Sequence, residues 1–574
     1  MSRLHARRFA ARNRFGAFAA LLVASTAFTA CGDDEDDDDG TGGSTAARGG
    51  TSSGKGGTSG TTGKGGSGGT AGSSKGGSAG TGTGGTAGGA GENAAGDGAG
   101  GDAVQGGAGG DDGVAGDDGA AGLGGAGGAG GAAPLPDPCR GIPLPEDQHY
   151  VAPGLCASAV AVQQGRLRQI AFTSNGDLIG VRVTGEIVRY RDENEDGMFE
   201  GASEIVTIAS TGGNGNNAHV DEVDGYLYAG ADGAVLRWEY DAASDDLGEP
   251  ESVVTSVPST GTHTYHTVHV HEGWLYVHAG SEDNAVAPAS PDYDTERAVI
   301  KRFELAEFDA EAPFEWADGD VFVRGVRNMV GFTHNAEGDF YGVDNGIDNL
   351  QYGGTDVHLD NPGEDLDHLV AGQAYGYPYC FTASNITDSS DVIVEAGTQL
   401  SSATDSSQPD PDFVNPHDDA WCEENATPPV TFLPAHAAPL DIKFYESVPQ
   451  GGLPDSWWGG AFVALHGSWN TSPSVGHSVV LVPFVNGSPS MPEASDEETD
   501  FPHIVVFGGG NASSHDDGIW GWSSGEDGED PVRPVSVAVS PIDGALYVSS
   551  DNATVSGGEA APLEGALYRI GIRQ

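Results

Sequence analysis

The chain has 574 residues, of which 93 are glycine, and its 85 acidic side chains outnumber the 25 basic ones. The formal net charge of −60 excludes nucleic acid as a natural partner and excludes a polybasic membrane surface, because binding to phosphate groups needs a surplus of Lys and Arg. Length alone permits about two to four domains.

The first 30 residues have the features of an export signal. Five arginines precede an apolar run from Phe15 to Ala30, and this run is too short and too rich in small residues to span a bilayer stably. It ends at Cys31, which follows Ala30 and precedes Gly32, and this resembles the lipobox of bacterial lipoproteins. We therefore expect a lipoprotein signal peptide over residues 1–30 and lipidation of Cys31. The anchored protein would face the periplasm or the cell surface; plain secretion is the alternative.

Residues 31–133 are predicted to be a disordered tether. An acidic run occupies residues 33–39, and residues 41–133 contain 41 glycines together with Ala, Ser, Thr and Asp. Such a segment has no apolar period and cannot bury a core. A flexible coil of this length spans roughly 50 Å on root-mean-square average.

Four cysteines remain after the expected cleavage: Cys139, Cys156, Cys380 and Cys422. An even number in an exported protein predicts two disulfides. Their order along the chain favours Cys139–Cys156 and Cys380–Cys422, although three pairings are possible.

From residue 134 onward, short β-rich runs alternate with turn residues, which is typical of an all-β fold. One motif, a turn glycine followed by an apolar strand, recurs six times, at Gly176, Gly225, Gly273, Gly338, Gly460 and Gly544. Six copies predict a six-bladed β-propeller over residues 134–574, in which radial stacking buries the strand faces. A pair of packed sheets is the alternative fold.

The fourth and fifth repeats are unusually far apart. A blade needs about 40–50 residues, whereas 122 positions separate Gly338 from Gly460. We therefore expect a large insertion within residues 339–459, and long insertions in compact domains often carry function.

Seven segments together resemble motifs of a known enzyme family. They are Gly261 to Thr267, Arg324 to Asn328 with Gly331, Asp344 to Asp348, Glu364 to Asp367 followed by Tyr375 to Cys380, His436 to Leu440, His466 to Asn470, and Arg533-Pro534. In this order they resemble the soluble glucose/sorbosone dehydrogenases, in particular the sorbosone dehydrogenase-like branch. That resemblance implies a six-bladed propeller that binds pyrroloquinoline quinone (PQQ) and calcium, as a quinoprotein dehydrogenase.

The resemblance implies roles for individual residues. His263 would be the general base that takes the proton of a sugar hydroxyl, a task that suits a neutral imidazole, and Arg327 would join it in catalysis. PQQ carries three carboxylates and needs cationic and hydrogen-bonding partners. The implied contacts are Arg168, His266, Arg327, Asn328, His436, His466 and Arg533.

Calcium prefers oxygen ligands. The resemblance implies that the carbonyls of Gly346 and Ile347 bind the calcium ion beside the cofactor. Asp365 and the Tyr375 carbonyl match a second, structural calcium position.

The charge balance makes the few arginines of the domain conspicuous. Residues 134–574 contain 16 basic side chains against 71 acidic ones, so any basic group that faces the propeller channel would stand out electrostatically.

The leading hypothesis is a cell-envelope enzyme that oxidises a sugar, or a related alcohol or aldehyde, and passes electrons to an unidentified periplasmic acceptor.

Several positions depart from the family pattern. His266 and Thr471 stand where the family has arginine, and Met329 stands where it has proline. Each charged hydrogen bond lost from the cofactor would weaken binding by about 1.5–3 kcal/mol. The second hypothesis is therefore a non-catalytic propeller of the same fold that serves as a ligand-binding or scaffold lipoprotein.

Overall fold

The computed structural model describes residues 140–573, with gaps at 146–147, 214–219, 286–295, 389–390, 405–412, 447, 450–451, 469, 472–474, 491–502, 510–531 and 553–563. The expected signal peptide, the lipidation site Cys31, the tether and Cys139 lie outside the described residues. Within the described part of the chain, no helix is both long and apolar enough to cross a membrane.

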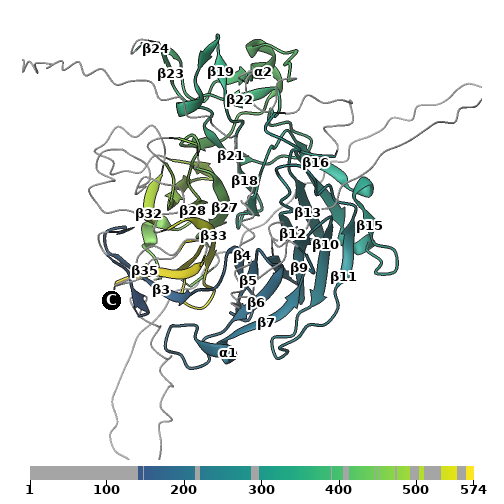
Figure 1. The fold of residues 1–574 in the computed structure, drawn as a ribbon, viewed down its shortest axis with the longest axis vertical. Helices are drawn as coiled ribbons and strands as arrows, with labels where there is room; N and C mark the ends of the chain where they lie inside the picture. The colour runs from purple at the N-terminus through teal and green to yellow at the C-terminus, as the bar shows by residue number, and fades with distance from the viewer. Residues whose placement is uncertain are drawn as a thin grey trace, which may run out of the picture. The chain divides into compact units, whose positions relative to one another are not determined.

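Six sheets of four or five strands account for most of the described chain, as Figure 1 shows. The first blade consists of β4 (Leu167–Phe172), β5 (Leu178–Arg182), β6 (Glu186–Tyr190) and β7 (Ile205–Ser210). The second consists of β8 (Val220–Val223), β9 (Tyr226–Ala231), β10 (Ala234–Glu239), β11 (Glu251–Thr255) and β15 (Phe314–Glu315). The third consists of β12 (Val268–His271), β13 (Trp274–Ala279), β14 (Val299–Glu304) and β16 (Asp320–Arg324).

The fourth blade consists of β17 (Gly331–His334), β18 (Phe340–Asp344), β21 (Glu364–His368) and β26 (Thr431–Leu433). The fifth consists of β27 (Pro439–Phe444), β28 (Ala461–Leu465), β29 (Ser478–Val482), β32 (Ile504–Gly509) and β2 (His149–Val151). The sixth consists of β33 (Pro534–Val539), β34 (Leu546–Ser550), β35 (Ala566–Ile572), β3 (Leu155–Val162) and β1 (Ile142–Pro143).

The first strands of the blades form a closed inner ring. Strand β4 contacts β8, β8 contacts β12, and the series continues through β17, β27 and β33 back to β4. This closure confirms the six-bladed propeller and excludes the two-sheet alternative. The repeated turns join the first and second strands of the blades, where a positive φ favours glycine, as at Gly176 (φ 91°) and Gly338 (φ 88°).

Apolar clusters fill the spaces between neighbouring blades. Phe462 and Leu481 of the fifth blade pack in one cluster with Val548 and Tyr568 of the sixth, and all four side chains are fully buried. Equivalent clusters join the other neighbouring blades. Each fully buried large apolar side chain contributes about 1.5–3 kcal/mol, so radial stacking is the main source of stability for this fold.

The ends of the described chain close the ring. Strand β3 pairs with β35, with Leu155 opposite Ile572, and β2 pairs with β32 in the fifth blade. The N-terminal strands therefore complete the last two blades.

The long interval between the fourth and fifth repeats contains extra elements (Figure 1). They are β19 (Gln351–Tyr352), β20 (Thr355–Asp356), β22 (Cys380–Thr382), β23 (Ile386–Asp388), β24 (Asp391–Val394), β25 (Gln399–Ser401) and α2 (Asp419–Asn425). The Cys380–Cys422 disulfide joins β22 to α2 and confirms one expected pairing. Cys156 is also disulfide-bonded. The remaining described elements are α1 (Gly201–Glu204), the hairpin of β30 (Phe484–Val485) and β31 (Ser488–Pro489), and four short 3-10 helices: η3 (Leu305–Glu307), η4 (Trp316–Asp318), η5 (His358–Asp360) and η6 (Asp455–Trp457).

Candidate functional site

The residues expected to bind the cofactor lie at the N-terminal ends of the inner strands, which we call the N-terminal rim. Arg168 is the second residue of β4, and Arg533 immediately precedes β33. His266, Asn328 and His436 each lie two or three residues before an inner strand. The closed ring therefore brings together positions that are far apart in sequence, in two neighbouring hydrogen-bonded groups.

The first group surrounds the carboxylate of Asp348, whose side chain is 11% exposed. It lies 3.3 Å from Arg327 Nη2 and 3.6 Å from His436 Nδ1, and it accepts a hydrogen bond of 2.9 Å from Asn470 Nδ2. Burial raises the pKa of Asp348, but the His436 hydrogen bond and the Arg327 charge outweigh it and hold the pKa well below its usual range. Burial lowers the pKa of His436, yet Asp348 outweighs it and raises the net value.

Arg327 is fully engaged inside the protein. Besides Asp348, its guanidinium donates to the backbone carbonyls of Asn284 (3.0 Å) and Asn345 (3.2 Å) and to Asn284 Oδ1 (2.9 Å). Its backbone N–H and that of Asn328 both donate to Asp344, each at 2.7 Å. Arg327 therefore links a loop of the third blade to a loop of the fourth blade by hydrogen bonds.

His263 is completely buried beside this group. Its Nδ1 lies 2.6 Å from Ser281 Oγ, and that hydroxyl donates its own hydrogen to the carbonyl of Asp283 at 2.8 Å. The Ser281 oxygen must therefore accept from Nδ1–H, which leaves a lone pair on Nε2. Nε2 has no hydrogen-bond partner among the described residues. Burial, with the Arg327 charge, lowers the pKa of His263 well below its usual value.

His266 differs in character from the arginine that it replaces. It is fully buried, and burial lowers its pKa to about 4. A neutral imidazole at this position supplies no positive charge at neutral pH.

The second group surrounds the buried carboxylate of Asp551. One of its oxygens lies 3.2 Å from Arg166 Nε, 3.4 Å from Arg168 Nη1 and 3.1 Å from His466 Nε2. The other nitrogen of His466 lies 3.2 Å from Arg533 Nη2. Burial and the Arg533 charge lower the pKa of His466 to about 3, so this ring is neutral.

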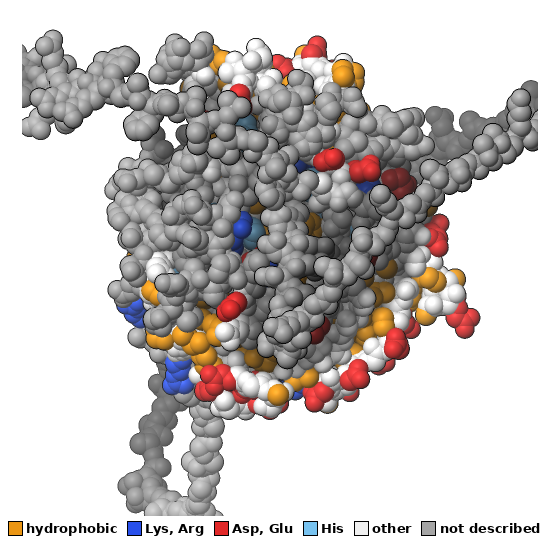
Figure 2. Space-filling model, in the orientation of Figure 1, with side chains coloured by type: hydrophobic (Ala, Val, Ile, Leu, Met, Phe, Trp, Pro, Cys, Tyr) orange, Lys and Arg blue, Asp and Glu red, His pale blue; other side chains and the backbone are white. Residues whose placement is uncertain are grey.

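The Asp551 group concentrates positive charge in an acidic domain. It combines three arginines with one aspartate, whereas Asp and Glu side chains are more frequent than Lys and Arg on the visible described surface in Figure 2. Arg168 also donates to the Tyr265 hydroxyl at 2.7 Å, and its guanidinium lies 5.2 Å from that ring centre. A rigid positive group of this kind is suited to an anionic ligand.

The two expected calcium positions differ in their surroundings. The carbonyl oxygens of Gly346 and Ile347 form no hydrogen bond with the described residues, and the Gly346 N–H donates to Glu364 at 2.8 Å. A Cβ atom on Gly346 would collide with the ring of Pro362. These features fit a hard cation held by backbone carbonyls.

At the second position, Asp365 lies opposite Asp344 in the pairing of β18 and β21, and Asp367 points to the same face. Asp365 Oδ1 and both carboxylate oxygens of Asp367 have no hydrogen-bond partner among the described residues. Burial raises the pKa of both groups. The Tyr375 phenol lies nearby and donates to the His368 carbonyl. Buried carboxylates with unused oxygens fit a bound cation.

Sequence reasoning missed several members of these groups. Asp551, Arg166 and Asn284 carry no recognisable motif, although Arg166 and Arg168 alternate at the start of one strand, which is a usable signal. Ser281 ends the segment Leu275 to Ser281, which resembles a strand of the glucose/sorbosone dehydrogenases, but the sequence predicts no role for it. The insertion also approaches this rim, since Phe381 and Leu400 pack in one apolar cluster with Ile347.

Comparison with known proteins gives consistent matches. A family model described as TrAA12-like matches residues 149–559. The pyrroloquinoline quinone-dependent pyranose dehydrogenase of Coprinopsis cinerea is 28% identical over 440 residues, covering 72% of this chain and 54% of that protein. This chain thus spans about half the length of that relative. A pyrroloquinoline quinone-dependent sugar dehydrogenase of Hypocrea jecorina is 26% identical over 341 residues, covering 57% of this chain and 73% of the relative.

Solved structures give the same result for the fold. The holo form of the PQQ domain of the Coprinopsis cinerea pyranose dehydrogenase superimposes with a TM-score of 0.59 at 26% identity, covering 75% of this chain and 99% of that one. A calcium structure of a Trichoderma reesei family AA12 enzyme superimposes with a TM-score of 0.58 at 23% identity, covering 75% and 98%. The latter supports the fold alone.

Proposed function

We propose, from the fact that the chain belongs to the TrAA12-like family, that it is an oxidoreductase acting on a sugar or a related alcohol or aldehyde with PQQ and calcium. The observation that carries this proposal is the pairing of two features on one rim. A buried histidine with an unpartnered Nε2 lies on the same rim as the three arginines grouped around Asp551.

The cofactor would be held by the basic group. The carboxylates of PQQ would take charged hydrogen bonds from Arg166, Arg168 and Arg533. The carbonyls of Gly346 and Ile347 would hold calcium at the cofactor. When bound, PQQ would accept the hydride, and calcium would polarise its reactive carbonyl as a Lewis acid.

The protein's own residues would then prepare the substrate hydroxyl. His263 Nε2 would accept the hydroxyl proton, because Ser281 fixes the proton of the ring on Nδ1. The lowered pKa keeps the ring neutral near pH 7, which is the form that accepts a proton. Arg327 would act as a positioning residue that fixes Asp348 and the calcium-binding loop, since its guanidinium is occupied by protein acceptors.

Reconstitution tests this proposal. The calcium-loaded protein would be titrated with PQQ and then assayed with a dye acceptor and a panel of aldoses, alcohols and aldehydes. We expect stoichiometric PQQ binding and substrate-dependent dye reduction, with turnover lost but PQQ binding kept in His263→Gln. Failure of PQQ to bind at micromolar concentrations would overturn the enzymatic role.

A non-catalytic propeller is the second candidate, and the neutral, buried His266 favours it. If loss of arginines at positions 266 and 471 has abolished cofactor binding, the double variant His266→Arg, Thr471→Arg should bind PQQ when the natural chain does not. Tight binding by the natural chain would exclude this candidate.

We also propose a cell-envelope location, with a lipid anchor at Cys31 and an unidentified periplasmic electron acceptor. Labelled palmitate should be incorporated into the natural chain and not into Cys31→Ser. Release of both proteins into the medium in equal amounts would favour plain secretion.

A further inference from the structure

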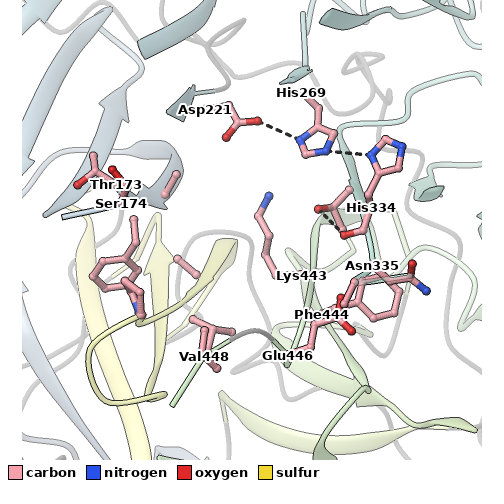
Figure 3. A pocket seen from close by; sticks show the side chains of 17 residues that line it. Thr173, Ser174, Asp221, His269, His334, Asn335, Lys443, Phe444, Glu446 and Val448 are labelled. Carbon is pink, nitrogen blue, oxygen red and sulfur yellow. Dashed lines mark hydrogen bonds and ion pairs between the residues drawn. The ribbon is translucent and has the colours of Figure 1, made fainter. Parts of the chain in front are cut away.

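A second polar site lies at the opposite ends of the inner strands, which we call the C-terminal rim. A cavity of about 490 Å³ is lined there by the ends of β4, β17, β27 and β33, with Asp221 from β8 and His269 from β12 (Figure 3). None of the residues proposed to bind PQQ or calcium lines this cavity. Whatever binds here is separate from the proposed redox site.

Three histidines converge at the wall of this cavity. His269 and His271 are two positions apart in β12 and therefore share one face of the strand. His334 is the last residue of the neighbouring inner strand β17. One ring nitrogen from each lies within 4.8 Å of the other two. His269 Nε2 and His334 Nδ1 are 3.1 Å apart. Two nitrogens that each bind one zinc ion at about 2.0–2.1 Å lie about 3–3.5 Å apart, so this spacing fits two ligands of one ion.

Asp221 gives His269 the orientation of a metal ligand. Its carboxylate lies 3.0 Å from His269 Nδ1 and also accepts from the Val270 N–H at 3.1 Å. Because the Asp221 carboxylate accepts from the Val270 N–H and also faces His269 Nδ1, it accepts from Nδ1–H, and Nε2 presents a lone pair towards His334. A histidine that donates to a carboxylate and binds metal through its other nitrogen is a recurrent arrangement. Figure 3 shows this chain from Asp221 through His269 to His334.

Ring stacking alone is the simpler explanation of the cluster. The His334 ring is stacked between His271, with ring centres 3.8 Å apart, and Phe340, with centres 4.1 Å apart. Stacking accounts for these parallel planes but requires no nitrogen at any position, and phenylalanine would serve as well. Stacking does not account for the carboxylate on His269 or for the approach of His271. Without a metal, a hydrogen bond from His334 Nδ1–H to His269 Nε2 accounts for the 3.1 Å contact, and the metal titration below separates the two explanations.

The cluster has the chemistry of a transition-metal site. Imidazole nitrogens favour zinc, copper and nickel, whereas calcium prefers oxygen ligands. The cavity beside His269 and His334 supplies an entry path and room for water on the ion.

We propose that His269, His271 and His334 bind one divalent transition-metal ion, of the zinc or copper class, at the C-terminal rim. Asp221 is the positioning residue that holds His269 in the metal-binding tautomer.

Competitive titration tests the site directly. The full exported chain, with calcium present throughout, would be titrated with Zn²⁺ against a chromophoric chelator, and bound zinc would be counted by elemental analysis. Co²⁺ absorption and the nitrogen couplings of bound Cu²⁺ in electron paramagnetic resonance would report the ligands. The variants are His334→Phe, which keeps the ring stack, His269→Gln and Asp221→Asn. His368→Ala, a half-exposed histidine on β21, is the control.

We expect one ion per chain, at least a 100-fold weaker affinity in His334→Phe and His269→Gln, and about 10-fold weaker binding in Asp221→Asn. His368→Ala should bind as the natural chain does. Circular dichroism would establish that each variant is folded. The proposal is overturned if no stoichiometric ion binds, if His334→Phe binds zinc like the natural chain, or if Cu²⁺ shows no nitrogen coupling.

Discussion

Replacing Asp551 with Asn should lower stability and raise the affinity for an anionic cofactor at the same time. The carboxylate is almost fully buried and neutralises part of the charge of Arg166 and Arg168. Breaking a buried ion pair typically costs about 3–5 kcal/mol. Arg166 is 15% exposed and can regain water, so we expect the lower end, about 3 kcal/mol. Removing one negative charge about 8 Å from a ligand carboxylate favours binding by about 2 kcal/mol at an effective dielectric of about 20, or at most roughly 30-fold.

Two measurements separate these effects. Chemical denaturation would give the change in the free energy of unfolding, and titration with PQQ in the presence of calcium would give the dissociation constant. The matched control is Asp543→Asn, since Asp543 forms a buried ion pair with Arg569 in the sixth blade, at the turn that follows the far end of β33. It should destabilise the protein comparably and leave PQQ affinity unchanged.

The PQQ affinity of Asp551→Asn can also contradict this prediction. If Asp551→Asn binds PQQ no more tightly than the natural chain, the Asp551 group does not receive the cofactor carboxylates. If Asp551→Asn folds poorly, Asp551→Glu retains the charge, and it should restore most of the stability without tightening PQQ.

Four further predictions can be checked with standard measurements. His263→Asn should lower kcat/KM by about 10²–10⁴-fold and leave the PQQ dissociation constant within threefold; steady-state assays with a matched PQQ titration decide this. Cys380→Ser should lower the free energy of unfolding by about 4 kcal/mol, because the disulfide closes a loop across a sequence separation of 42, and denaturation of the variant beside the natural chain, both without reductant, is the check. The pKa of His436 is raised in the folded state, so its stabilising contribution is present below about pH 6.5 and is lost as the pH rises through the folded value. The destabilisation in His436→Gln, measured by denaturation, should therefore be larger at about pH 6 than at about pH 9. Calcium at 100 times its dissociation constant should stabilise the protein by about 2.7 kcal/mol per site, and Asp365→Asn should remove one such increment from the calcium-dependent shift in unfolding temperature.

The number of blades could be predicted because each blade contains a local sequence signal in its first hairpin. A tight turn such as that at Gly338 needs a positive φ, and this requirement recurs at every first hairpin. The assignment of β2 and β3 to the last two blades could not be predicted. Pairs such as Leu155 with Ile572 lie more than 400 positions apart, and no local pattern specifies such a partner.

The candidate site was predictable to the extent that its residues sit in recognisable segments. Arg168 and Arg533 could be placed at strand starts, yet Asp551, which binds Arg168, directly follows β34 and belongs to no motif. Arg327 was expected to contact the cofactor, and that remains a prediction. Its donors are occupied by Asn284 and Asn345, because a loop of another blade reaches it in a way that only the folded ring reveals.

The histidines of the C-terminal rim illustrate the same limit. The alternation of His269 and His271 is visible in the sequence, but His334 joins them only because β12 and β17 are neighbours in the inner ring.

The pairing of β3 with β35 has a consequence for biogenesis. During synthesis β3 emerges more than 400 residues before its partner β35, so the ring stays open until β35 has been made. Contacts of such long sequence separation make folding slow, and blades one to four can stack before the closing strands meet. A truncation that removes β35 would leave β3 without its partner strand. Loss of these seven residues should thus be far more damaging than their number suggests, because they close the ring.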